Sequence, residues 1–290
     1  MNYKKTIVNI RIEFSNYLRN NKIEAVVIGI SGGMDSCLCA ALAKPVCDAV
    51  GIPLIGAMLP SDTNQSDEKD RAKLTCDAFC TESKSLPINP FFNSISNVIN
   101  PDPIIGYNSG ENIKSLKIRN GNIKARLRMI ILYNLASENR GLVLSTDNYT
   151  EYLLGFWTLH GDVGDYGMIQ NLYKTEVYDM AEWIAENECK LDESTALTST
   201  IEALATDGLG VTTRGDLGQI LPEWQGSSRD GYKEVDRILK LWLERHELGD
   251  MQKIVIENTL KDHPVIQRHL RSEFKRNNPI NITRNKIINN

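Results

Sequence analysis

The segment Gly29–Ser36, with the sequence GISGGMDS, constrains the fold of this chain more than any other stretch. It directly follows the apolar run Ala25–Ile28, and a short continuous run of this kind is typical of a parallel strand that is buried on both faces. Adjacent glycines between a strand and a helix leave backbone N–H groups free at the positive end of the helix dipole. The segment therefore predicts a phosphate-binding turn at the end of a buried strand.

The side chains of this segment indicate a metal ion as well as a phosphate. Ser31 and Ser36 can donate hydrogen bonds to a phosphate, whereas Asp35 repels one unless a divalent cation lies between them, which predicts Mg²⁺. The segment matches neither G-x-x-x-x-G-K-[ST] nor G-x-G-x-x-G, which argues against a P-loop NTPase and a Rossmann dinucleotide site. The simpler alternative is a tight turn in which Asp35 or Ser36 only caps the helix. A cap needs one polar residue, and five small or polar residues cluster here.

Strands and helices alternate through roughly the first 150 residues, which predicts an α/β fold with a parallel sheet flanked by helices. The apolar runs predict strands over 25–30, 53–59, 84–88 and 141–145. Apolar residues at spacings of three and four, or stretches of small residues, predict helices over 4–20, 35–50, 66–80 and 123–137.

The second half of the chain is predicted to be mainly helical, with helices over 174–187, 229–246, 250–260 and 263–273. Residues 89–120 are rich in Asn, Pro and Gly, so we expect a long loop with at most one helical turn. We expect a single domain over 1–290, in which 1–205 form a nucleotide-binding core and 206–290 a helical C-terminal part.

Charge and hydropathy exclude several function classes. The net charge is −4 and the isoelectric point about 5.7, so no global positive field exists to gather nucleic acid or an anionic membrane. No run approaches the ~18 apolar residues of a membrane span, and the start lacks the pattern of a signal peptide. We expect a cytoplasmic protein that binds neither nucleic acid nor a membrane.

The pattern S-G-G-x-D-S after a strand resembles the pyrophosphatase loop of the ATP pyrophosphatases, the PP-loop superfamily. These enzymes cleave ATP between its α and β phosphates and adenylate a substrate oxygen. The resemblance implies ATP as co-substrate and a three-layer, Rossmann-like fold of the adenine nucleotide alpha hydrolase type. It also implies that ATP is bound by residues of this segment, namely Gly29, Ser31, Gly32, Gly33, Asp35 and Ser36.

Further motifs select among the substrates of that superfamily. Together they resemble the ammonia-dependent NAD synthetase family, and the resemblance covers roughly residues 20–280. The implied reaction is ATP-dependent amidation of deamido-NAD, which gives NAD, AMP and pyrophosphate through an adenylate. The chain has no room for a glutaminase domain, so free ammonia is the expected nitrogen source, and a homodimer is implied. The motifs are Asn122–Met129 (NIKARLRM), Ser145–Glu151 (STDNYTE), Gly155–Thr158 (GFWT), Gly161-Asp162, Asp165 and Lys174.

The ATP side of the site can be argued from position as well as resemblance. Thr146 and Asp147 lie just past the end of a predicted strand, at the sheet edge where open α/β sheets bind ligands, and Glu151 follows on the next helical turn. By resemblance, Asp35 and Glu151 hold Mg²⁺ on the ATP phosphates, and Thr146 contacts ATP. Lys174 opens a predicted helix, where a cation opposes the dipole, so an anionic neighbour is expected. The family gives that neighbour as ATP phosphate.

The deamido-NAD side rests on resemblance, which assigns Arg126, Asp165 and Lys275 to this substrate. Asp165 is also the candidate for taking a proton from ammonium. A surface ion pair is the alternative for Arg126. Lys124 and Arg128 share a helix face that Arg126 does not, and we expect that face to be solvated.

Three positions depart from the family pattern. Ala205 replaces the proline that usually precedes the ATP-contacting threonine, here Thr206. Phe274 stands where a histidine is usual, and Leu159 where a substrate-binding lysine is frequent. Two polar contacts to deamido-NAD are therefore absent, which affects the binding of the dinucleotide and not the ATP chemistry.

Two other functions are compatible with the phosphate loop. The chain could adenylate a different acceptor, such as another carboxylate or a tRNA base, although the acidic isoelectric point argues against tRNA. It could also be a nucleotide sensor without catalysis. A sensor has no need to retain Asp35, Glu151 and Lys174 together.

Overall fold

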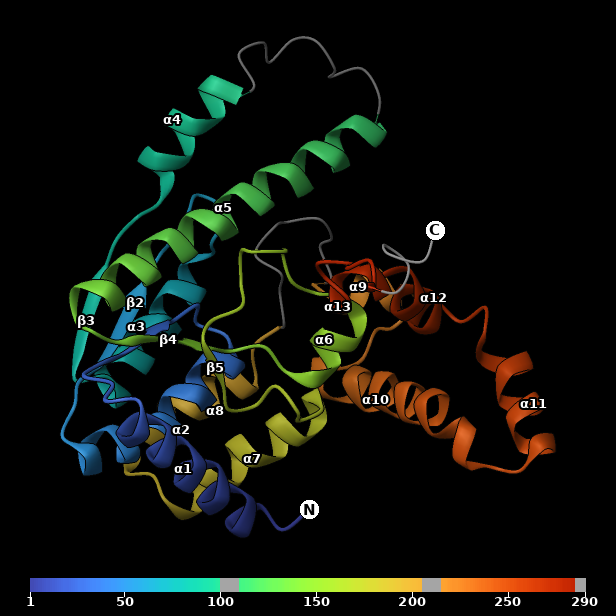
Figure 1. The fold of residues 1–290 in the computed structure, drawn as a ribbon, viewed down its shortest axis with the longest axis horizontal. Helices are drawn as coiled ribbons and strands as arrows, with labels where there is room; N and C mark the ends of the chain where they lie inside the picture. Colours follow the sequence, from blue (N-terminus) through green and yellow to red (C-terminus); the bar gives the residue numbers. More distant parts are fainter. Residues whose placement is uncertain (100–109, 205–214, 285–290) are drawn as a thin grey trace.

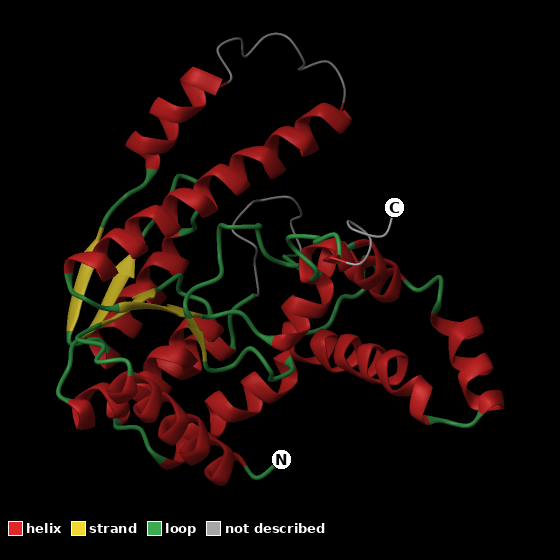
Figure 2. Ribbon diagram, viewed as in Figure 1, coloured by secondary structure: helices red, strands yellow, loops and turns green. Residues whose placement is uncertain are grey.

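The molecule contains a five-stranded, entirely parallel sheet, which lies to the left of the C-terminal helices in Figures 1 and 2. The computed structural model describes residues 1–99, 110–204 and 215–284. The strand order is β3-β2-β1-β4-β5, which confirms the predicted α/β class. The strands are β1 (Val26–Gly29), β2 (Leu54–Met58), β3 (Glu82–Ser85), β4 (Leu142–Ser145) and β5 (Tyr166–Gly167).

The central strand β1 is buried on both faces, as its apolar sequence predicts. Val26 and Ile28 belong to one hydrophobic cluster and Val27 to the other, because successive side chains of a strand point to opposite faces. All three side chains are fully buried, and each contributes about 1.5–3 kcal/mol to stability relative to an exposed position. This burial fixes the register of β1 between β2 and β4.

Helices cover both faces of the sheet, which gives three layers (Figure 1). Met129, Leu132 and Leu135 of the long helix α5 pack against one face, and α4 lies beside α5. The opposite face carries most of the remaining helices of the first 201 residues. The elements are α1 (Tyr3–Asn20), α2 (Met34–Val50), α3 (Ser66–Phe79), α4 (Asn89–Ile99), α5 (Gly110–Glu138), α7 (Lys174–Asn187) and α8 (Leu191–Ile201).

The C-terminal part is helical in the residues that the structure describes, as predicted. Helix α10 packs against α7 and α12 and joins the larger hydrophobic cluster through Val235 and Ile238. Among the described residues, no helix is both long and apolar enough to cross a membrane. The elements, with the short α6 that precedes α7, are α6 (Tyr149–Leu154), α9 (Leu217–Ile220), α10 (Ser228–Glu244), η1 (Arg245–Glu247), α11 (Asp250–Leu260), α12 (Pro264–Arg271) and α13 (Glu273–Arg276).

The prediction of a loop over 89–120 was wrong for the residues described there. Residues 89–99 form α4, and α5 begins at Gly110 rather than near 123. Asn and Gly are poor helix formers, so the composition favoured a loop. Packing overrides this preference, since Phe92 of α4 is buried and α4 packs on α5. The third strand also begins two residues earlier and ends three residues earlier than predicted, and α8 was missed.

Candidate active site

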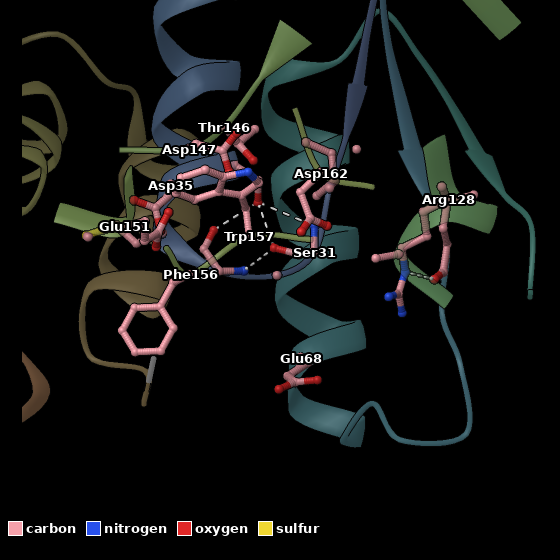
Figure 3. Close-up of a pocket in the computed structure, with 18 of the residues that line it drawn as sticks. Ser31, Asp35, Glu68, Arg128, Thr146, Asp147, Glu151, Phe156, Trp157 and Asp162 are labelled. Carbon is pink, nitrogen blue, oxygen red and sulfur yellow. Dashed lines mark hydrogen bonds between the residues drawn. The ribbon is translucent and has the colours of Figure 1, made fainter. Parts of the chain in front are cut away.

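A cavity of about 1270 Å³ opens at the carboxyl ends of β1, β2 and β4 (Figure 3). Single small ligands usually occupy about 300–1,000 Å³, so the cavity has room for more than one nucleotide-sized substrate. The segment Gly29–Ser36 lines it together with residues that follow β4, the first residue of α7, and the C-terminal helices α12 and α13. The predicted sheet edge is therefore the edge that carries the cavity.

The glycine segment places the first turn of α2 against the cavity. Gly32 has a φ of +83°, a conformation that a side chain disfavours, and Arg71 Nε holds its carbonyl oxygen at 3.0 Å. Ser31 Oγ accepts the Gly33 N–H at 3.1 Å, and Ser36 Oγ donates to the Gly33 carbonyl at 3.0 Å. The two hydroxyls thus organise the loop backbone, which leaves the amides at the start of α2 to receive an anion.

The alternative of a simple helix cap loses support. Gly33 occupies the N-cap position of α2 and, within the described residues, no side chain there caps the helix by a hydrogen bond. The Asp35 carboxylate instead accepts a hydrogen bond from Asn148 Nδ2 at 3.0 Å and contacts Lys174. A cap would not need these partners from two distant segments.

Asp35, Glu151 and Lys174 meet in one cluster at the end of the glycine loop, in which Lys174 is buried and the two carboxylates are partly exposed, although α2, α6 and α7 carry them. Lys174 Nζ contacts the Asp35 carboxylate and lies 3.3 Å from Glu151 Oε1. Only 4% of the Lys174 side chain is exposed. Burial works to lower the pKa of Lys174, but the two carboxylates outweigh it and hold that pKa well above its usual range. The predicted anionic neighbours of Lys174 thus include two side chains of the protein itself.

The same cluster suits a magnesium ion. Asp35 and Glu151 already converge on one cation, and carboxylate oxygens are the ligands that Mg²⁺ prefers. Among the described residues, no group of three or more His, Cys, Asp or Glu side chains could by itself enclose a metal. This fits an ion that keeps waters and takes further ligands from substrate phosphates. Burial, followed by the charge of Asp35, raises the pKa of Glu151 to about 7 although Lys174 opposes the shift.

The other carboxylates that line the cavity include Asp147 and Asp162, which belong to the quoted motifs but were given no role from the sequence. Asp147 Oδ2 accepts a hydrogen bond from Ser145 Oγ at 2.8 Å, and Asp162 accepts one from the Thr158 N–H. Burial, then the neighbouring Glu151, raises the pKa of Asp147 to about 8, and burial also raises the pKa of Asp162. The sequence offered one signal for each residue: Asp147 directly follows a predicted strand, and Asp162 lies in a glycine-rich loop.

The raised pKa of Asp147 predicts a pH-dependent loss of stability. The folded protein keeps this proton up to about pH 8, whereas an unfolded aspartic acid releases it near 3.8, so stability falls as pH rises through this window. The asparagine side chain of Asp147→Asn resembles the protonated aspartic acid but has no proton to release. The variant should therefore not lose stability in this way as the pH rises. Its stability should exceed that of the wild type by a margin that grows by at most about 1.4 kcal/mol per pH unit. Urea unfolding of both proteins between these pH values measures the margin, and parallel pH curves would contradict the assignment.

Most of the predicted site residues that the structure describes line the cavity, but two do not. A further predicted residue, Thr206, lies outside the described residues. Arg126 and Asp165 are not among the described residues that line the cavity. Those that do line it are Gly29, Ser31, Gly32, Gly33, Asp35, Ser36, Thr146, Glu151, Lys174 and Lys275.

The exposure of the basic residues of α5 is the reverse of the prediction. Lys124 is 6% exposed and pairs with Asp62, and Arg128 donates from Nε to the Leu59 carbonyl at 3.1 Å while it lines the cavity. The prediction that Lys124 and Arg128 form a solvated face was therefore wrong. The reason is that this face of α5 packs toward the sheet, so that Arg126 is exposed and donates to the Leu159 carbonyl at 3.2 Å. In Figure 3, Arg128 lies on the side of the cavity away from Asp35.

Asp165 anchors the edge of the sheet. Its carboxylate accepts hydrogen bonds from the Tyr133 hydroxyl and the Val143 N–H, both at 2.9 Å, and the side chain is exposed. Its predicted contact with deamido-NAD stays a prediction. Asp162, three residues earlier, is the carboxylate of this loop that faces the cavity.

The far wall of the cavity is aromatic and basic. The Arg268 guanidinium lies 3.9 Å from the ring centroid of Phe156, and Lys275 Nζ donates to the Gly155 carbonyl at 2.7 Å. Burial and the nearby Arg268 lower the pKa of Lys275 to about 8. Trp157 and Phe274 also line this wall, which therefore offers flat faces to bases and cations to phosphates.

The parallel sheet, the glycine loop and the carboxylate–lysine cluster together define a nucleotide-binding α/β protein. Comparison with known proteins agrees: the NAD synthase family model matches residues 6–193. An NH₃-dependent NAD⁺ synthetase of Pyrococcus furiosus is 31% identical over 97% of this chain and 95% of its own length. The chain therefore belongs to the NAD synthase family.

Solved structures share the fold. A structure of NMN synthetase from Francisella tularensis has a TM-score of 0.72 at 23% identity, covering 98% of this chain and 99% of the other. NH₃-dependent NAD synthetase from Campylobacter jejuni has a TM-score of 0.65 at 20% identity, covering 98% of this chain and all of the other. Both likenesses extend through the helical C-terminal part.

Proposed function

We propose that the protein is a carbon–nitrogen ligase that amidates deamido-NAD with ammonia at the expense of ATP, which becomes AMP and pyrophosphate. The observation that carries this proposal is the cluster of Asp35, Glu151 and the buried Lys174 at the end of the glycine loop. Membership of the NAD synthase family, and the similarity to the NH₃-dependent NAD⁺ synthetase of Pyrococcus furiosus, support the choice of substrates.

In the first step, a carboxylate oxygen of the nicotinate attacks the α-phosphorus of ATP, and the bond to the β-phosphate oxygen breaks as pyrophosphate leaves. Two anions must approach each other, so the site has to offset their repulsion. The amides at the start of α2 and the Lys174 ammonium would stabilise the phosphates, and Asp35 and Glu151 would hold Mg²⁺. When bound, the ion would supply further positive charge to offset the repulsion.

In the second step, ammonia attacks the acyl carbon and AMP leaves as the amide forms. Ammonium must first lose a proton, and a base with a pKa near the working pH does this best. Asp165 was the predicted candidate, but its carboxylate bonds Tyr133 and Val143. We assign the role to Asp162, which lines the cavity whereas Asp165 does not; the Asp162 carboxylate accepts the Thr158 N–H, and burial raises its pKa.

Lys275, Trp157 and Phe274 are proposed to hold deamido-NAD at the aromatic and basic wall. The ring faces suit stacking of the bases, and Lys275 suits the phosphates. The predicted contact from Arg126 would require its side chain to leave the Leu159 carbonyl.

We further propose a single-domain subunit that forms a homodimer in the cytoplasm. One hydrophobic cluster runs from β1 to α10 and α12, which supports a single domain. Ile130 and Tyr133 of α5 are 64% and 38% exposed, and exposed apolar groups of this kind support a contact with a second copy.

The test is an incubation with ATP, Mg²⁺, ammonium and deamido-NAD in which AMP and NAD are both quantified. We expect them to form in equal amounts. Parallel incubations replace ammonium by glutamine, and deamido-NAD by other carboxylates, including nicotinic acid mononucleotide, which carries the same carboxylate. AMP formed only with another acceptor would identify a different adenylating enzyme, and ATP binding without AMP in any incubation would identify a nucleotide sensor.

A further inference from the structure

Helix α10 supplies a buried carboxylate to the elements that carry the charged cluster. Asp236 is 2% exposed and lies one helical turn after Tyr232, whose ring centroid is 5.6 Å from Lys174 Nζ. Asp236 Oδ2 accepts the N–H of Thr175 at 2.9 Å, and Oδ1 accepts the hydroxyl of Thr150 at 2.5 Å. A carboxylate buried this deeply is costly unless it is satisfied by hydrogen bonds, as this one is.

The Thr150 hydroxyl extends this contact to the start of α7. While it donates to Asp236, its Oγ1 accepts the N–H of Lys174 at 2.9 Å. Lys174 and Thr175 are the first residues of α7, where helix N–H groups lack partners within the helix. Asp236 and Thr150 provide these partners, and a negative charge beside a helix N-terminus is also favoured by the dipole.

The groups that Asp236 and Thr150 hold belong to Lys174 itself and to the sequence neighbours of Lys174 and Glu151. Thr150 directly precedes Glu151 in α6, and Thr175 directly follows Lys174 in α7. Neither Asp236 nor Thr150 is among the described residues that line the cavity. Their effect on the reaction must therefore pass through Glu151 and Lys174.

We propose that Asp236 is a positioning residue for the adenylation step: through Thr150 and Thr175 it fixes the geometry of Lys174 and Glu151 around the phosphates. The inference rests on the proposed function. It assigns a catalytic consequence to the helical C-terminal part, because Asp236 lies beyond residues 6–193, which the family model matches. A displacement of about 1 Å in a catalytic group can lower a rate by about 100-fold, so a small shift of α7 suffices.

Asp236→Asn is the first variant, because it keeps the volume and one of the two hydrogen bonds. The amide oxygen can still accept the Thr175 N–H, but the amide NH₂ faces Thr150 Oγ1 with a donor in place of an acceptor. Glu234→Gln is the matched control. It makes the same change of charge on the same helix, at a residue that pairs with Arg237.

We expect Asp236→Asn to lower kcat by about 10- to 100-fold with a change of about threefold or less in the KM for ATP, while Glu234→Gln stays near the wild type. Thr150→Val should reproduce the loss and Thr150→Ser should restore most of the activity. The double variant Asp236→Asn, Thr150→Val should lose no more than the worse single variant, since both act through one contact. A kcat within about twofold of the wild type for Asp236→Asn, or losses that multiply, would overturn the proposal.

Hydrogen–deuterium exchange separates failure of this proposal from failure of the proposed function. A wild type that does not amidate deamido-NAD refutes the function and leaves the positioning claim open to the same structural measurement. Asp236→Asn should increase exchange in the peptide that contains Lys174 and Thr175, at a temperature where both proteins are folded, and Glu234→Gln should not. Unchanged exchange in Asp236→Asn would overturn the proposal whatever the activity.

Discussion

Asp35→Asn is expected to lower kcat by roughly 10³-fold while the protein stays folded. The substitution keeps the side-chain volume but removes the charge that contacts Lys174 and that we propose as a magnesium ligand. Stability should fall by about 1–3 kcal/mol, because Lys174 retains Glu151 as a partner. Steady-state production of AMP and thermal unfolding of the same preparation measure the two effects.

Asp48→Asn provides the matched control for this variant. Asp48 is on the same helix, its side chain is 54% exposed, and it pairs only with Lys44 among the ion pairs of the described residues. Its turnover should equal that of the wild type. Near-normal turnover in Asp35→Asn would contradict the assignment of Asp35 to the metal and the phosphates.

Gly32→Ala should abolish tight binding of ATP and lower the free energy of unfolding by about 3 kcal/mol or more. A Cβ at this position would lie 2.0 Å from the carbonyl oxygen of Glu68, and the backbone has a φ of +83°. The obstructing atom belongs to the backbone of α3, so it cannot move aside as a flexible side chain can. Isothermal titration with ATP and urea unfolding test both expectations.

Gly51→Ala isolates the contribution of the backbone conformation. Gly51 has a similar φ of +81°, but a Cβ there would meet nothing within 4 Å. It should cost about 1–2 kcal/mol of stability and leave ATP binding unchanged. Equal losses in the two variants would show that the contact with Glu68 does not constrain the loop.

The parts of the fold that follow from local sequence were predictable. The strands β1, β2 and β4 are largely buried and apolar apart from Ser145 at the end of β4, and glycine marks the end of α2 at Gly51. Helix α7 was predicted with its observed ends, Lys174 and Asn187. Helix α4 was not, because its Asn-rich sequence has little helix preference and its packing on α5 is a long-range contact.

The sequence predicted which charged residues belong near the site more readily than where their side chains point. Helical geometry separated Arg126 from Arg128 correctly, but only the packing of α5 on the sheet decides which of them is exposed. Residue spacing around Asp165 likewise could not show that Asp162 faces the cavity. Asp236 carries no motif, and its importance depends on α10 meeting α6 and α7 in space.

The most direct test of the central claim follows the carboxylate oxygen of the acceptor. Deamido-NAD labelled with ¹⁸O in its nicotinate carboxylate is turned over with unlabelled ATP and ammonium, and AMP and pyrophosphate are analysed by mass spectrometry. Attack of the carboxylate on the α-phosphorus transfers one labelled oxygen to each AMP and leaves pyrophosphate unlabelled. Label in pyrophosphate, or unlabelled AMP beside newly formed NAD, would contradict adenylation in this cavity.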